Sequence, residues 1–200
     1  MILIIDNYDS FVHMLGQYVG ELGYERQFVR NDRIDIRSIL ARPPDAIILS
    51  PGPATPQKAG ICIELVKACQ GQIPILGICL GHQAIAVAYA ELAGEESLGT
   101  VTRAPYPAHG VSAEIYHKNH PLFAGIPSPF TAARYHSLAI THMPENLEAL
   151  AQTPDGINMA VGDTAAQIYG LQFHPESILT PHGKQILQNF FTLTQKQVAA

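Results

Sequence analysis

The feature that most constrains the fold is a glycine-flanked cysteine between an apolar run and a helix-like run. Residues 73–78 are almost entirely apolar, Cys79 follows with Gly77 and Gly81 on either side, and residues 83–90 have a helix-forming composition. Glycine lacks the Cβ atom that would crowd a sharp turn, so the backbone can present the Cys79 sulfur at a strand–turn–helix junction. The amide groups that open the following helix would favour a thiolate and an oxyanion beside it. The pattern predicts a nucleophile elbow.

A cysteine at a tight turn can also be a small buried packing residue, which is the commoner role of a free cysteine. A second stretch, residues 170–177, favours the catalytic interpretation because it places His174 and Glu176 on either side of Pro175. If this stretch is extended, both side chains lie on one face, and a proline suits a strand end. An imidazole that accepts the thiol proton and a carboxylate that orients the ring would complete a Cys-His-Glu triad.

Composition limits the class of protein. Of the 200 residues, 47% are hydrophobic and only 14% are charged, which favours a folded domain over a disordered chain. The formal charge of −5 comes without a basic block, so nucleic acid is not an expected partner. No run reaches transmembrane length, and a carboxylate at Asp6 comes too early for a signal peptide. We therefore expect a single domain over residues 1–200, in the cytoplasm and not at a membrane.

Three cysteines form neither a disulfide scaffold nor a metal site in this pattern. Cys62 and Cys69 are seven residues apart on an expected helix, and no histidine or further cysteine stands near them at ligand spacing. We expect both to be packing residues and expect no metal in this chain.

Short apolar runs alternate with amphipathic runs in the first two-thirds of the chain. This alternation is typical of an α/β fold, with a mostly parallel open sheet flanked by helices. The expected strands are 2–6, 27–30, 46–50, 73–78 and 168–174, and the expected helices are 10–22, 34–41, 60–68, 83–90 and 183–194. Between them, β-rich segments interrupted by prolines predict a small antiparallel or mixed β addition at the sheet edge, over 100–104, 112–116 and 131–134.

These motifs resemble those of class I glutamine amidotransferases, which carry the nucleophile in Gly-x-Cys-x-Gly and the other two triad residues in His-Pro-Glu. The resemblance is strongest to the branch that serves chorismate, the glutaminase subunits of anthranilate synthase and aminodeoxychorismate synthase (component II). It is carried, in family order, by Asp-Asn-Tyr-Asp-Ser-Phe at 6–11, Ser-Pro-Gly-Pro at 50–53, Arg-Tyr-His-Ser-Leu at 134–138 and Phe-His-Pro-Glu-Ser-Ile-Leu at 173–179.

The resemblance implies a glutaminase that hydrolyses L-glutamine to glutamate and ammonia through a cysteine thioester. Its catalytic residues would be Cys79, His174 and Glu176. The residues implied for substrate and oxyanion binding are Gly52, Pro53, Leu80, Gln83, Ser137 and Leu138.

A partner is also implied. The chain has no P-loop and no dinucleotide fingerprint with which to activate an acceptor of ammonia. The ammonia would therefore pass, within a heteromer, to a chorismate-using synthase, either anthranilate synthase or aminodeoxychorismate synthase. No cofactor is expected in this chain, and Mg²⁺ is expected in the partner.

Two other functions stay open at this level. A stand-alone cysteine hydrolase acting on γ-glutamyl bonds would use the same elbow. A binding module without catalysis would be expected to lack a triad residue, and none is missing.

The sequence departs from the family pattern at four places. Ala54 stands where glycine is common, Val111 stands where lysine is usual, residues 158–163 lack a usual basic pair, and residues 91–99 form a longer turn. None of these changes touches the triad. They would change the charges at an interface with the partner.

Overall fold

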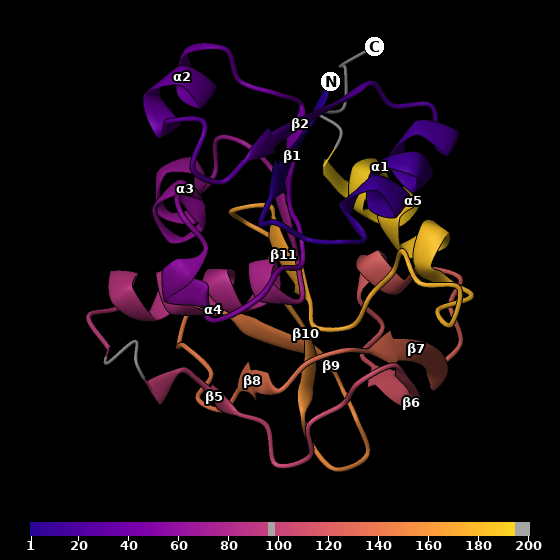
Figure 1. Cartoon of the computed structure of the whole chain (residues 1–200). Helices are drawn as coiled ribbons and strands as arrows, with labels where there is room; N and C mark the ends of the chain where they lie inside the picture. The colour runs from indigo at the N-terminus through magenta and orange to yellow at the C-terminus, as the bar shows by residue number, and fades with distance from the viewer. Residues whose placement is uncertain (96–98, 195–200) are drawn as a thin grey trace.

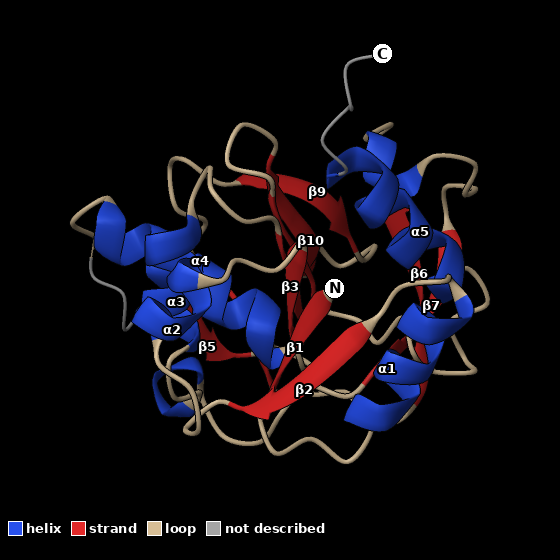
Figure 2. Ribbon diagram, turned by 90° about the horizontal axis from the view of Figure 1, so that it is seen from above, coloured by secondary structure: helices blue, strands red, loops and turns tan. Residues whose placement is uncertain are grey.

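The structure, a computed structural model, describes residues 1–95 and 99–194. Residues 96–98, within the long turn noted at 91–99, lie outside the described part. A large β-sheet separates two groups of helices, with α2, α3 and α4 on one face and α1 and α5 on the other (Figures 1 and 2). The helices are α1 (Val12–Glu21), α2 (Ile36–Ala41), α3 (Cys62–Cys69), α4 (Leu80–Leu92) and α5 (Gly183–Thr194).

Neighbouring strands in one half of the sheet are all parallel and follow the order β2-β1-β3-β4-β11. Their bounds are β1 (Ile2–Asp6), β2 (Arg26–Arg30), β3 (Ala46–Leu49), β4 (Ile75–Ile78) and β11 (Ile168–Leu171). All except the edge strand β2 are buried along their whole length, because helices cover both faces. This burial explains the continuous apolar runs of the sequence, and the predicted α/β class is confirmed.

The other half of the sheet is antiparallel and continues in the order β10-β9-β6-β7, while β5 and β8 form a separate pair. The bounds are β5 (Val101–Arg103), β6 (Val111–His117), β7 (Phe130–Arg134), β8 (Leu138–Ile140), β9 (Glu148–Gln152) and β10 (Asn158–Asp163). The predicted antiparallel addition to the sheet is present for 112–116 and 131–134, whereas 100–104 lies in the separate pair and not at the sheet edge. The addition is also larger than the sequence pattern indicated, because β8, β9 and β10 were not among the expected strands.

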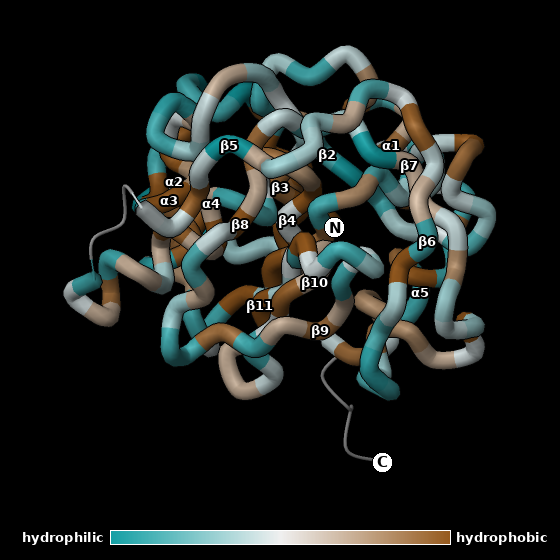
Figure 3. The backbone as a smooth tube through the Cα atoms, turned by 90° about the horizontal axis from the view of Figure 1, so that it is seen from below, coloured by the Kyte–Doolittle hydropathy of each residue, from teal (hydrophilic) through white to brown (hydrophobic). Residues whose placement is uncertain are grey.

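Two hydrophobic clusters fill the spaces between the sheet and the helices. One lies under α1 and α5 and includes Leu15 and Phe190, and the other lies under α2, α3 and α4 and includes Leu65 and Ile85. Figure 3 shows hydrophobic residues concentrated around β3, β4, β11 and α3, with polar residues along the outer loops. Among the described helices, none is both long and apolar enough to cross a membrane.

Candidate active site

Cys79 occupies the turn between β4 and α4, as the sequence pattern predicted. Its φ is 51° and its ψ is −98°, a backbone conformation that residues other than glycine rarely adopt. Helix α4 begins at the next residue. The Cys79 amide donates a hydrogen bond of 2.8 Å to the Leu171 carbonyl at the end of β11. The cysteine is therefore anchored to the centre of the sheet, with 7% of its surface exposed.

The two glycines beside the elbow allow the helix to approach the sheet. A Cβ atom on Gly77 would lie 2.4 Å from the carbonyl group of Gly81, and one on Gly81 would lie 2.5 Å from the Leu49 carbonyl oxygen of β3. Both distances are too short for non-bonded atoms, so any larger residue would push α4 away from β3 and β4. The role that the sequence pattern predicted for these glycines therefore has a direct steric basis.

His174 and Glu176 meet as predicted, although the local geometry differs from the prediction. Strand β11 ends at Leu171, and Glu176 lies in a turn, so the two side chains are not neighbours on an extended strand. In this turn Nδ1 of His174 lies 2.6 Å from Oε1 of Glu176. The turn is compact because the His174 carbonyl accepts hydrogen bonds from the Ser177 amide and the Thr180 hydroxyl.

The electrostatic surroundings favour the charged form of His174. Burial by itself would lower the pKa of the ring, but interactions with Cys79 and with the Glu176 carboxylate outweigh burial and raise it to about 10. An imidazolium beside a cysteine favours the thiolate, which is the nucleophilic form. The second ring nitrogen, Nε2, is buried and has no hydrogen-bond partner at normal distance among the described residues. It is therefore available to Cys79 and to a substrate.

The loop after β3 brings Gly52 next to the elbow. A Cβ atom on Gly52 would lie 2.6 Å from the Asn7 carbonyl oxygen and 3.0 Å from a methyl carbon of Leu80. Asn7 holds this loop from the other side, since its amide groups donate to the hydroxyl and carbonyl oxygens of Ser50. The structure thus places Gly52 beside Leu80, while Pro53 is exposed on the same loop.

Gln83 and Leu138, which lie far apart in the sequence, are in contact. Nε2 of Gln83 donates to the Leu138 carbonyl at 3.0 Å and also lies 3.0 Å from Oε1 of Gln172. Ser137 is exposed, and its carbonyl already accepts a hydrogen bond from the Ala104 amide. No role for Gln172 was predicted from the sequence, although it lies two residues before His174 in the stretch 170–177.

A small pocket of about 150 Å³ opens beside His174 and Glu176. Tyr135 forms one wall, with its ring edge-on to the His174 ring at 5.1 Å between centroids. The other lining residues are Phe11, Met14, Ser177 and Ile178. Tyr135 belongs to the motif at 134–138, but its position over the histidine could not be inferred without the fold.

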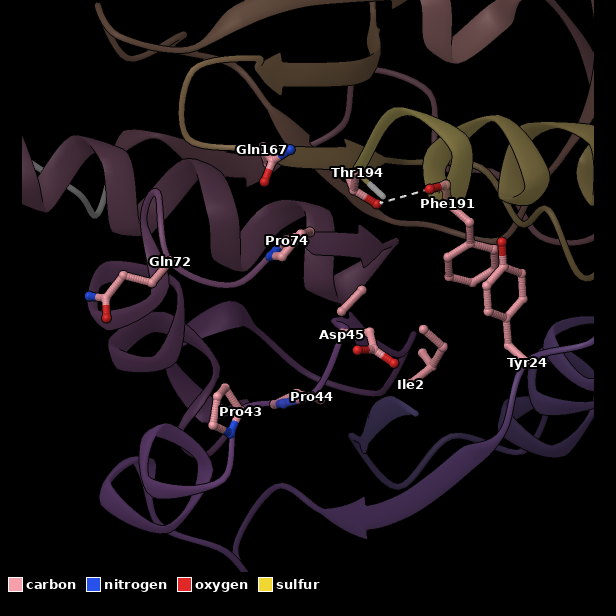
Figure 4. Close-up of a pocket in the computed structure, with 11 residues that line it drawn as sticks. Ile2, Tyr24, Pro43, Pro44, Asp45, Gln72, Pro74, Gln167, Phe191 and Thr194 are labelled. Atoms are coloured by element: carbon pink, nitrogen blue, oxygen red, sulfur yellow. Dashed lines mark hydrogen bonds between the residues drawn. The ribbon is translucent and has the colours of Figure 1, made fainter. Parts of the chain in front are cut away.

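A larger cavity, of about 490 Å³, lies away from these residues (Figure 4). It is at the amino ends of the parallel strands, where Ile2, Asp45 and Pro74 line it together with Phe191 and Thr194 of α5. Neither cysteine nor histidine occurs among its lining residues, and Asp45 pairs with the amino group of Met1. The smaller pocket is therefore the one that adjoins the candidate active site, on the side of His174 and Glu176; Cys79 is not among its lining residues.

The fold and the site together define a class of α/β protein with a cysteine on a strand–helix elbow and a His–Glu pair beside it. The chain belongs to the class-I glutamine amidotransferase family, whose family model matches residues 3–193. The family resemblance of the sequence motifs is thereby confirmed.

Relatives and solved structures agree with this placement. The chain is 45% identical over 199 residues to anthranilate synthase component 2 of Azospirillum brasilense, with 98% of this chain and 97% of that protein covered. It is also 45% identical to the aminodeoxychorismate/anthranilate synthase component 2 of Bacillus subtilis, over the full length of both. A crystal structure of a candidate GMP synthase protein from Thermoplasma acidophilum superposes with a TM-score of 0.83, at 27% identity, and covers 96% of this chain and 92% of that one.

Proposed function

We propose that the chain is the glutaminase subunit of a chorismate-using synthase, and that it hydrolyses L-glutamine to glutamate and ammonia. The observation that carries this proposal is the approach of the His174–Glu176 pair to Cys79 on its elbow, within a glutamine amidotransferase fold. The nucleophile, the proton carrier and the group that orients it are then all supplied by this chain.

The proposed reaction begins with attack of the Cys79 thiolate on the side-chain amide carbon of glutamine. The carbonyl oxygen becomes an oxyanion, for which the backbone N–H groups of Leu80 and Gly52 are the proposed donors. Each such donor contributes roughly 10²–10³ in rate. His174 then protonates the departing nitrogen, the C–N bond breaks, and ammonia leaves a γ-glutamyl thioester on Cys79.

Water completes the cycle. His174, now neutral, takes a proton from a water molecule as the oxygen attacks the thioester carbon, and the C–S bond breaks to release glutamate. Glu176 holds the ring in orientation through Nδ1 and stabilises its charged form in both steps. Gln83, Ser137, Leu138 and Pro53 are the proposed contacts for the amino-acid end of glutamine, and the reaction needs no cofactor in this chain.

The partner in this proposal is either anthranilate synthase or aminodeoxychorismate synthase, because relatives of this chain carry both names. Ammonia released into bulk water would be protonated and lost, so a protein must cover the pocket. Phe11, Met14 and Ile178 leave apolar surface exposed around it, which suits such a cover. Chorismate and Mg²⁺ would bind to the synthase. The free cysteines Cys62, Cys69 and Cys79 favour a reducing compartment, the cytoplasm.

The test is glutamate release by the purified chain, alone and with each candidate synthase plus chorismate. Cys79→Ala should abolish glutamine-dependent product formation and leave ammonia-dependent formation by the synthase intact. Cys69→Ala is the matched control, since Cys69 is a buried packing residue of α3 and its loss should preserve activity.

Stimulation by one synthase identifies the pathway, and stimulation by both identifies a shared component. Loss of the ammonia-dependent reaction as well would contradict the division of labour. High activity on γ-glutamyl substrates without stimulation by either synthase would instead establish a stand-alone hydrolase.

A further inference from the structure

A series of buried hydrogen bonds leads to the sulfur of Cys79 through a side chain that the proposed reaction does not use. Nε2 of Gln172 lies 3.6 Å from Sγ of Cys79, a distance suited to an N–H donor and a sulfur acceptor. Gln172 is fully buried, and its backbone amide donates to the Met159 carbonyl of β10 at 2.9 Å. Its side chain is therefore held at the base of the site.

The orientation of the Gln172 amide follows from hydrogen-bond chemistry. A backbone carbonyl can only accept, so the Gln83 atom that lies 3.0 Å from the Leu138 oxygen must be Nε2. The same nitrogen lies 3.0 Å from the Gln172 side chain, which must present Oε1 to it. The other Gln172 atom, Nε2, then faces the sulfur as a donor.

The Leu138 oxygen also accepts a second hydrogen bond, from a buried histidine. Nδ1 of His136 lies 2.8 Å from the same Leu138 oxygen and so carries a proton, while Nε2 of His136 accepts from Nε of Arg134 at 3.1 Å. Burial, together with the charge of Arg134, lowers the pKa of His136 to about 4, so the ring is neutral at physiological pH. Arg134, His136, Gln83 and Gln172 are all buried, and the Leu138 carbonyl accepts from both His136 and Gln83.

We propose that Gln172 is a positioning residue for the nucleophile, whose amide N–H holds the Cys79 sulfur and stabilises it as a thiolate. The inference rests on the proposed function only in taking Cys79 as the nucleophile. A hydrogen bond to an anion is stronger than one to a neutral group, so this donor favours the thiolate over the thiol. Because Gln172 is bonded to Gln83 and through it to Leu138, the substrate-binding segment and the nucleophile share one hydrogen-bond network.

The experiment is the pH profile of Cys79 alkylation by iodoacetamide in the full chain, with the modified residue located by peptide mass spectrometry. Gln172→Met keeps the length and burial of the side chain but removes the donor. We expect the midpoint of the profile to rise by about one pH unit, with alkylation about tenfold slower below the wild-type midpoint. Gln172→Glu, which keeps an acceptor for Gln83, should shift the midpoint in the same direction. His174 interacts directly with the sulfur, Glu176 and Asp9 interact with His174, and all three are unchanged in both variants.

Met159→Ala is the control for a purely structural effect, since it removes buried packing from the residue whose carbonyl accepts from the Gln172 amide and keeps the side-chain donors of Gln172. It should lower stability and leave the profile in place. A folded Gln172→Met whose profile coincides with that of the wild type would overturn the inference alone. A wild-type Cys79 no more reactive than free cysteine would overturn the proposed function and this inference together.

Discussion

Backbone strain at single residues is concentrated around the candidate site. Cys79, Tyr8 and Ala54 all have positive φ, at 51°, 61° and 69°. Tyr8 follows Asn7, which holds the loop after β3, and Ala54 lies on that loop two residues after Gly52. Such conformations cost energy for residues with a Cβ atom and persist where the surrounding structure imposes them. Among the described residues, one further non-glycine residue has positive φ, Gln167 at 57° in the turn before β11, so three of these four strained positions lie near the candidate site.

Ala54 gives the first prediction at this scale. Ala54 stands where glycine is common in the family. Its positive φ, and not its size, explains that preference, so alanine at this position carries a conformational cost. We expect Ala54→Gly to raise the free energy of unfolding by about 0.5–1 kcal/mol, because relief of the left-handed strain exceeds the added entropy of the unfolded chain. Urea denaturation measures this change in the free energy of unfolding.

The matched control is Ala93→Gly. Ala93 is also exposed, but its φ of −76° suits any residue, so the same change should destabilise the protein. Equal effects at the two alanines would contradict the conformational explanation.

At the scale of elements, the junction of β4 and α4 depends on close backbone contact. We expect Gly81→Ala to destabilise the protein by about 1–3 kcal/mol, because the added methyl group would meet the Leu49 carbonyl oxygen of β3. Alkylation of Cys79 should slow as well, since displacement of α4 moves the elbow. Thermal or urea unfolding and the alkylation rate are the two measurements.

Gly99→Ala serves as the comparison, because no described atom lies within 4 Å of the position of its Cβ. That variant should stay within about 0.5 kcal/mol of the wild type. If Gly81→Ala behaved in the same way, the close packing of α4 against β3 would not be needed.

The elements also show what could be predicted from sequence. The strands of the parallel half are apolar runs between helices, so they could be predicted from the sequence. The elbow at Cys79 could be predicted in the same way. Strand β10 is buried on nearly all its length and includes Asn158, Ala160 and Gly162. Val161 is its one β-branched residue, and polar and apolar residues do not alternate along it. Its absence from the predicted elements has this physical cause.

The site was predictable to the extent that it lies in short motifs. His174 and Glu176 are near neighbours in the chain, so their pairing could be predicted even though a turn, and not a strand, brings them together. The contacts of Gln83 with Leu138 and Gln172 join three distant segments. Only the folded sheet determines such contacts, and no spacing in the sequence encodes them.

At the scale of the whole molecule, the surface around the pocket is more apolar than a surface that faces only water needs to be. Ile178 is 86% exposed at the rim, beside Phe11 and Met14. We expect Ile178→Asp to leave stability unchanged and to weaken the complex with the synthase about tenfold, since a buried apolar anchor would become a buried charge. Titration of the synthase against glutaminase activity measures the apparent Kd.

Leu92→Asp is the control, because Leu92 is another exposed apolar residue, 51% exposed, at the end of α4. It should leave the apparent Kd unchanged. An effect at Leu92 but none at Ile178 would move the interface to a different face of the molecule.

The proposed nucleophile and the proposed base are attached to different parts of the sheet. Cys79 is fixed at the centre, between β4 and β11, whereas the amide of His174 is bonded to the Ala133 carbonyl of the edge strand β7. Ala133 is bonded in turn to the hydroxyl of Thr180, which closes the histidine turn. A displacement of the β6–β7 hairpin therefore changes the distance between sulfur and imidazole. In the proposed reaction the rate would then depend on the position of an outer hairpin, so that mechanical force applied at the rim of the sheet would be converted into a change of chemistry at its centre.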